Sequence, residues 1–198
     1  MNSKLGYISN ILTALRAGIA PCLIWDAKDG HISHWFLVLF ICGVLSDFFD
    51  GEILRRLKIT NIQLRSLDSV MDAIFYMSVF VSMWFTHPAV IQTFIIPIAI
   101  LLFTQTCSWM FSLIKYGKTT SYHSYIAKLW GATLLAGTIG FFVGQYQLFL
   151  FCVIFGIFSN MEDIFITAIM PYWKCDILNI RSARELRDQW KQSPIFSL

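Results

Sequence analysis

Long apolar runs dominate this chain of 198 residues and limit what it can fold into. Hydrophobic residues make up 57% of the sequence and charged residues 14%, whereas soluble domains average roughly 45–50% and 25%. An apolar run of about 20 residues is long enough to cross a bilayer as a helix. The sequence therefore predicts an all-α, polytopic membrane protein, and its length leaves no room for a second domain.

The apolar runs predict a bundle of six transmembrane helices. Their expected bounds are 7–26, 34–57, 66–86, 89–114, 123–143 and 146–170. Lysine and arginine concentrate after the second run, after the fourth run and in the tail, and cytoplasmic segments are enriched in these residues. Both termini are therefore expected in the cytoplasm. Residues 1–172 are expected to form the membrane domain and residues 173–198 a polar cytoplasmic or interfacial tail with a short helix.

Four aspartates lie close together in or beside apolar runs: Asp47, Asp50, Asp68 and Asp72. A charged side chain at the centre of a membrane helix costs at least ~2.5–3.5 kcal/mol, so four together imply a positive charge among them. The first two are three residues apart and the last two are four apart, so each pair shares one helix face. The topology places both pairs at similar depth on adjacent antiparallel helices, near the cytoplasmic face. The simplest positive partner is Mg²⁺ or Mn²⁺, which prefer oxygen ligands.

Two basic residues, Arg16 and Lys128, lie inside the first and fifth apolar runs. Each could extend its charged end to the membrane interface, where long basic side chains find water. For Arg16, a carboxylate such as that of Asp50 or Glu52 is a further structural partner. The residues alone leave these interpretations open.

A second acidic pair, Glu162 and Asp163, lies within the sixth apolar run. The pair could neutralise a basic residue of the bundle, end an interrupted helix, or contact the active site. The net charge of +3 is too small to indicate a nucleic acid partner. The five cysteines lack C-x-x-C spacing, which is typical of small buried side chains and not of a zinc site.

The segment that holds the four aspartates resembles the signature of the CDP-alcohol phosphatidyltransferase family, D-x2-D-G-x2-A-R-x8-G-x3-D-x3-D. The four aspartates, Gly51 and Arg55 all fall in register. Two positions depart from the signature, because Leu54 replaces its alanine and Leu64 its second glycine. Small residues at these positions let the backbone approach the nucleotide, so the departures concern donor binding.

Two flanking segments extend the resemblance. Residues 10–16, NILTALR, followed by Pro21, look like the opening of the family's first span. Residues 127–131, AKLWG, match more weakly a lysine-containing element of the fifth span. The resemblance therefore covers the first five spans, and six spans is also the family's number.

The resemblance implies a role for each matching residue. The metal ligands would be Asp47, Asp50, Asp68 and Asp72, which would hold two Mg²⁺ or Mn²⁺ ions, and Asp72 would also be the general base. The CDP moiety would be bound by Asn10, Thr13, Arg16, Gly51 and Arg55. Lys128 would bind the acceptor or its phosphate.

The resemblance implies an enzyme of phospholipid biosynthesis, a transferase that moves a phosphatidyl group from CDP-diacylglycerol to an alcohol and releases CMP. A small polar, phosphorylated acceptor such as glycerol 3-phosphate is favoured, with Lys115, Lys118 and Lys128 as candidate cations for its phosphate. The fourth run, 89–114, contains no arginine, and relatives that use glycerol phosphate usually have one there. The expected location is the inner (plasma) membrane, with the active site facing the cytoplasm and a second copy of the chain as partner in a homodimer.

Three other functions remain open. One is transfer from a CDP-amino-alcohol or CDP-polyol donor to a lipid alcohol. Another is divalent-cation transport, although a transporter should have acidic residues along the whole crossing. The last is a catalytically inactive member of the family, which Leu54 and Leu64 raise.

Overall fold

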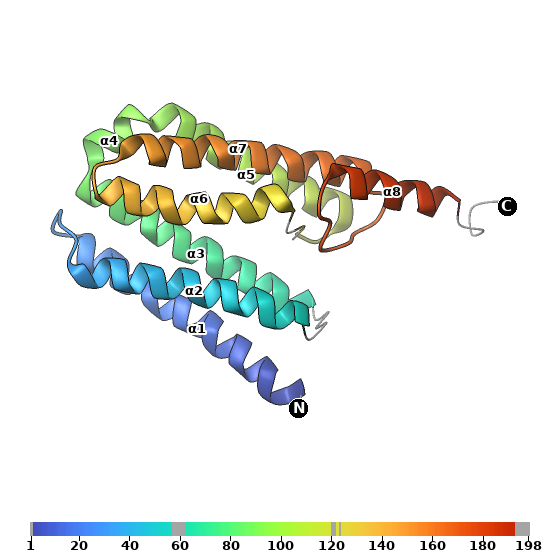
Figure 1. The fold of residues 1–198 in the computed structure, drawn as a ribbon, viewed down its shortest axis with the longest axis horizontal. Coiled ribbons are helices and arrows are strands. Elements are labelled where there is room, and N and C mark those ends of the chain that lie inside the picture. The colour runs from blue at the N-terminus through green and yellow to red at the C-terminus, as the bar shows by residue number, and fades with distance from the viewer. Residues whose placement is uncertain (1, 57–61, 120–121, 123, 193–198) are drawn as a thin grey trace. The chain divides into compact units, whose positions relative to one another are not determined.

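The structure is a computed structural model that describes residues 2–56, 62–119, 122 and 124–192, with side chains from residue 11 onward except at 50–56 and 62–69. Within these ranges the chain forms helices and no strands (Figure 1). The helices are α1 (Asn2–Ala27), α2 (His34–Arg56), α3 (Ile62–Thr86), α4 (Pro88–Thr93), α5 (Ile95–Tyr116), α6 (Tyr125–Phe142), α7 (Tyr146–Ile169) and α8 (Ile180–Lys191). The all-α class is confirmed.

Most of the predicted spans coincide with one long helix each, and the fourth does not. The run 89–114 is divided between α4 and α5, with Phe94 outside both helices. Pro97 lies in the first turn of α5, where proline is tolerated. Deeper in a helix a proline bends or breaks it, because its ring crowds the carbonyl four residues earlier. The break at Phe94 fits this preference, although α1 continues through Pro21.

In the part of the chain that the structure describes, three helices are long and apolar enough to cross a membrane: α5, α6 and α7. Within the described residues, the apolar stretches of α2 and α3 are shorter and cover His34–Phe49 and Val70–Thr86. These helices support a membrane protein, while six spans and cytoplasmic termini stay predictions. The described part of the tail contains the expected helix, α8. Asn179 caps its N-terminus, and the Asn179 side chain accepts a hydrogen bond from the Ser182 amide at 2.8 Å.

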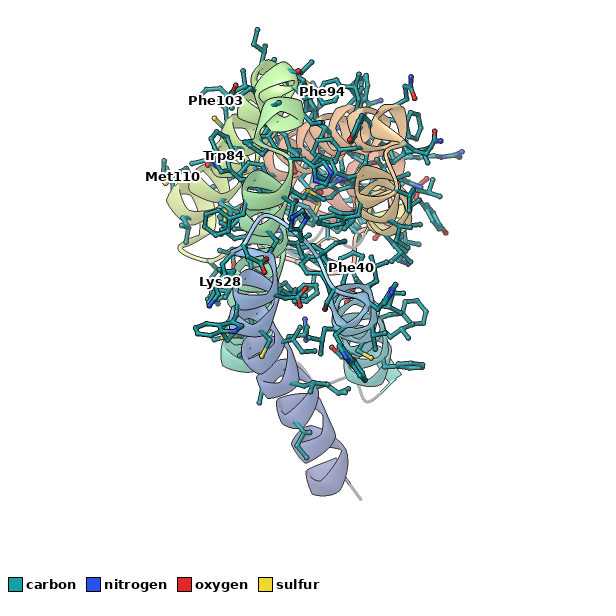
Figure 2. All side chains as sticks on the ribbon, turned by 90° about the vertical axis from the view of Figure 1, so that its left-hand side faces the viewer. Lys28, Phe40, Trp84, Phe94, Phe103 and Met110 are labelled. Carbon is teal, nitrogen blue, oxygen red and sulfur yellow. The ribbon has the colours of Figure 1, made fainter. Side chains whose placement is uncertain are left out.

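The chain divides into two units, of which the first comprises residues 1–92. Its central helix is α1, whose backbone lies close to both α2 and α3, while the backbones of α2 and α3 approach each other at fewer positions. Phe40 of α2, labelled in Figure 2, stacks on Phe75 of α3 with ring centroids 6.2 Å apart, and both side chains are fully buried. Gly43 makes this packing possible, because a Cβ atom there would overlap the Phe75 ring.

The second unit comprises residues 93–198, and its central helix is α7. α7 packs against α5 and α6, and α8 contacts its C-terminal part. Gly156 of α7 leaves space for the Trp130 ring of α6, since a Cβ there would collide with the indole. Apolar side chains on α5, such as Phe103 and Met110, are exposed, which suits contact with lipid (Figure 2).

Candidate active site

Arg16 is a buried basic residue of the first unit that contacts two acidic side chains. Its side chain lies on α1 and is fully buried, with 0% exposure. Its Nη1 nitrogen lies 3.2 Å from Oδ1 of Asp47 on α2, and the same nitrogen forms an ion pair with Oδ1 of Asp72 on α3. One guanidinium nitrogen therefore joins carboxylates from two other helices, and α1, α2 and α3 meet at this point.

The two aspartates lie at similar depth along their helices. Asp47 is nine residues before the end of α2 at Arg56, and Asp72 is ten residues after the start of α3 at Ile62. At 1.5 Å per residue these separations are about 14 Å and 15 Å. The side chains of Asp47 and Asp72 are 34% and 27% exposed, so an ion or a hydroxyl group can reach both from outside the helices. For these two residues, one from each predicted pair, the helix positions agree with the expected common level.

Only half of the predicted metal site can be compared with the structure, because the side chains of Asp50 and Asp68 lie outside the described residues. Among the residues whose side chains are described, no group of three potential metal ligands occurs. Asp47 and Asp72 nevertheless direct oxygen atoms toward a single positive charge. An all-oxygen donor set that already converges on a cation fits Mg²⁺ or Mn²⁺.

Of the residues predicted to bind CDP, the structure describes Thr13 and Arg16 with their side chains. Thr13 is buried on α1, one turn before Arg16. The side chains of Asn10 and Arg55, and the surroundings of Gly51, lie outside the described residues. Thr13 and Arg16 therefore share one region of α1, and Arg16 contacts predicted metal ligands there.

Lys128, the predicted acceptor residue, lies in the second unit. Its side chain is exposed on α6, and Nζ is 5.7 Å from the centroid of the Tyr125 ring. Ser124 caps the N-terminus of α6, shortly before Lys128 in the sequence. Its Oγ accepts a hydrogen bond from the Ala127 amide at 3.1 Å. An exposed ammonium group near the start of α6 is accessible to a phosphate group.

The second acidic pair lies inside α7, and one of its members has a partner that the sequence did not indicate. Glu162 is buried and accepts a hydrogen bond from Ser124 Oγ at 2.5 Å, so its partner here is a hydroxyl group. The prediction that the pair ends a helix is wrong, because α7 continues to Ile169. The Oδ1 atom of Asp163 is buried and has no hydrogen-bond partner among the described residues.

Lys115 has a structural partner that sequence reasoning missed. Its Nζ donates hydrogen bonds to the carbonyls of Thr167 at 2.6 Å and Ala168 at 3.1 Å, in the last turn of α7. The Tyr116 hydroxyl also donates to the Thr167 carbonyl at 3.0 Å. A positive charge at a helix C-terminus is favourable, because the last carbonyls lack partners within the helix. The only advance signal was the position of Lys115 at the end of an apolar run.

Asp47 and Asp72 were not singled out in advance as partners of Arg16, although the sequence contained a usable signal. Four carboxylates at membrane depth require a positive charge, and Arg16 is the basic residue of the first apolar run. What the sequence could not show is that Arg16 faces both α2 and α3. That placement depends on how α1 packs between the two helices.

The fold and the site together define a helical membrane protein in which carboxylates of two helices converge on one cation. The family model for CDP-alcohol phosphatidyltransferase matches residues 6–174, and the chain belongs to this family. Neither a search of curated proteins nor a search of solved structures found a match. The chain is therefore a transferase of substituted phosphate groups that uses a CDP-alcohol donor and an alcohol acceptor in a membrane.

Proposed function

We propose that the chain transfers a phosphatidyl group from CDP-diacylglycerol to a small phosphorylated alcohol such as glycerol 3-phosphate, with release of CMP. The observation that carries this proposal is the convergence of Asp47 and Asp72, from two helices, on one positive charge. Phosphoryl transfer needs cations beside the diphosphate and a carboxylate within reach of the attacking hydroxyl. Two partly exposed carboxylates at one level support this proposal, because such groups can bind divalent cations and accept the proton of a hydroxyl group.

In this proposal the four aspartates bind metal, and one of them is also the general base. Asp47, Asp50 and Asp68 hold Mg²⁺ or Mn²⁺, and Asp72 also accepts the proton of the acceptor hydroxyl as the new phosphate ester bond forms. Bound divalent ions supply charge neutralisation for the diphosphate and for the CMP leaving group. Asn10, Thr13, Gly51 and Arg55 orient the nucleotide, and Arg55 is suited to paired hydrogen bonds with phosphate oxygens. For Arg16, nucleotide binding also stays a proposal.

The acceptor phosphate is assigned to Lys128. Its exposed ammonium group is accessible, whereas Lys115 donates to carbonyls of α7. Lys118, with Nζ 5.3 Å from the Trp173 ring centroid, is the second candidate for the same phosphate. The proposed location is the plasma membrane, with the aspartates on the cytoplasmic side, where water-soluble acceptors are available.

A substrate panel tests the proposal. The purified chain is placed in lipid nanodiscs with Mn²⁺ and labelled CDP-diacylglycerol, and CMP release is measured with glycerol 3-phosphate, inositol phosphate, glycerol, inositol and serine. The expected result is CMP release that requires a phosphorylated alcohol and is lost in Asp72→Asn. Asp188→Asn, which changes an exposed aspartate of α8, is the matched control and should retain activity.

Two results would contradict the proposal. CMP release only with a CDP-amino-alcohol donor and diacylglycerol would move the enzyme to the other branch of the family. Absence of CMP release with every donor and acceptor, in protein that still binds Mn²⁺, would indicate an inactive member or a cation transporter.

A further inference from the structure

The geometry points to Arg16 as a resident counter-cation of the aspartate site. It is a positioning residue that holds the carboxylates of Asp47 and Asp72 together and shares them with an incoming divalent cation. This inference rests on the proposed function in one respect, because it takes these two aspartates as metal ligands. It adds a role for Arg16 that differs from direct contact with the nucleotide.

The contacts of Arg16 support a bridging role. One nitrogen, Nη1, is paired with Oδ1 of Asp47 and with Oδ1 of Asp72, which lie on different helices. α2 and α3 touch through Phe40 and Phe75, whereas the backbones of both helices lie closer to α1. Arg16, on α1, therefore provides a direct polar link between the two carboxylates.

Burial shows from which side each partner approaches. The side chain of Arg16 is 0% exposed, whereas those of Asp47 and Asp72 are 34% and 27% exposed. The guanidinium thus approaches the carboxylates from inside the unit, and their accessible sides are left for an external cation. An arriving ion and Arg16 then interact with the same two carboxylates.

Electrostatics gives this arrangement two opposite consequences. Without a divalent ion, Arg16 compensates the charge of two aspartates that would be costly to leave unpaired within a helical bundle. A divalent ion held by the same carboxylates would meet the like charge of the guanidinium, which would weaken binding of the ion. Removal of Arg16 should therefore destabilise the metal-free protein and tighten its affinity for metal.

Two simpler roles predict different results. An arginine that only held the diphosphate would change KM for the donor and leave Mn²⁺ affinity unchanged. An arginine that only supported packing would lower stability equally with and without Mn²⁺. Opposite changes in metal-free stability and in metal affinity are expected only from a counter-cation.

The experiment measures thermal unfolding and Mn²⁺ binding of the full chain in nanodiscs, for the unaltered chain, Arg16→Gln and Arg16→Lys. The seven tryptophans report unfolding, and electron paramagnetic resonance reports free Mn²⁺. For Arg16→Gln, the metal-free midpoint should fall by roughly 5–10 °C, and the half-saturating Mn²⁺ concentration should fall about tenfold. Arg16→Lys keeps the charge without the fork, so its Mn²⁺ affinity should stay close to that of the unaltered chain. Arg184→Gln, at an exposed arginine of α8, should change neither quantity.

Unchanged or weaker Mn²⁺ binding in Arg16→Gln would overturn the inference. If Arg16→Gln folds only in the presence of Mn²⁺, that result supports the inference. If Arg16→Gln does not fold even with Mn²⁺, the Mn²⁺ affinity of Arg16→Lys is the test. In that case an Arg16→Lys affinity that differs several-fold from that of the unaltered chain overturns the inference. The measurement needs no turnover, so absence of CMP release would contradict the proposed function alone, and an unaltered Mn²⁺ affinity in an active Arg16→Gln variant would contradict this inference alone.

Discussion

The two units support the acidic residues of their helices in different ways. In the first unit, Asp47 and Asp72 are paired with the guanidinium of Arg16. In the second unit, Glu162 accepts a hydrogen bond from the Ser124 hydroxyl, and Asp163 has a buried oxygen without a hydrogen-bond partner among the described residues. One unit places a full positive charge beside its carboxylates, and the described part of the other offers a neutral donor.

The difference indicates which acidic residues can exchange partners. The carboxylates of Asp47 and Asp72 already face a positive charge and remain partly exposed, as the proposed binding of a divalent ion requires. Glu162 is buried and directed at one serine that also begins α6, so its hydrogen bond joins two helices. We therefore expect the first set to carry the chemistry and the second to stabilise packing.

The largest expected contrast is between Asp72→Asn and Asp163→Asn. Loss of the proposed base should reduce the rate of CMP release by about 10²–10⁴-fold. Asp163→Asn removes a carboxylate of the second unit and should leave the rate within about threefold, if only packing is affected. Initial rates at saturating substrate, normalised to folded protein, make the comparison. Equal losses in the two variants would break the distinction between the units.

Asp47→Asn should weaken metal binding more than Glu162→Gln does. Outer-shell partners of metal ligands are worth roughly 10–100-fold in affinity, so loss of a direct ligand should raise the half-saturating Mn²⁺ concentration by at least about tenfold. Glu162→Gln keeps an acceptor oxygen for Ser124 and should bind Mn²⁺ normally. Mn²⁺ titrations followed by electron paramagnetic resonance measure both. Normal Mn²⁺ binding and normal activity in Asp47→Asn would refute the metal site.

The two lysines of the second unit allow a smaller test. Lys128→Gln should raise KM for the phosphorylated acceptor about tenfold, because one charge-assisted contact is worth roughly 1.5–3 kcal/mol. Lys115→Gln should leave that KM unchanged and lower stability, since its ammonium group binds the end of α7. Acceptor titrations of both variants measure the two KM values and show which lysine contacts the acceptor phosphate. A raised KM only in Lys115→Gln would exchange the two roles.

The smallest expected effect is that of Ser124→Ala. Glu162 would lose its donor and α6 its capping hydroxyl, at a cost of about 1–3 kcal/mol in the free energy of unfolding. Thermal unfolding of the variant in nanodiscs, with Ser182→Ala in α8 as a control for an ordinary serine, measures the loss. An unchanged unfolding midpoint in Ser124→Ala would show that the Glu162 hydrogen bond contributes little.

Much of the fold was predictable because apolar length limits where a helix can begin and end. The second run was expected at 34–57 and α2 covers His34–Arg56, while the last was expected at 146–170 and α7 covers Tyr146–Ile169. The run 89–114 was expected as one span, and the break before α5 was not predicted. The length of an apolar run contains no information on how a proline such as Pro97 affects the preceding turn.

The site was predictable in its residue types and less so in its pairings. The spacing of the aspartates predicted two carboxylate pairs at one depth, and the described members, Asp47 and Asp72, agree with it. The pairing with Arg16 depends on the rotation of α1, and that of Glu162 with Ser124 on the packing of α6 against α7. Such contacts between distant segments follow from tertiary packing, which no local pattern specifies.

The most direct test of the account is the metal dependence of CMP release by the unaltered chain in nanodiscs. Labelled CDP-diacylglycerol and glycerol 3-phosphate are supplied, the protein is first treated with EDTA, and Mn²⁺ is then added in steps. If the aspartates act through bound metal, the chain should release no CMP in EDTA and should recover saturably over the same Mn²⁺ concentrations at which binding saturates. CMP release that persists in EDTA at the full rate would contradict it.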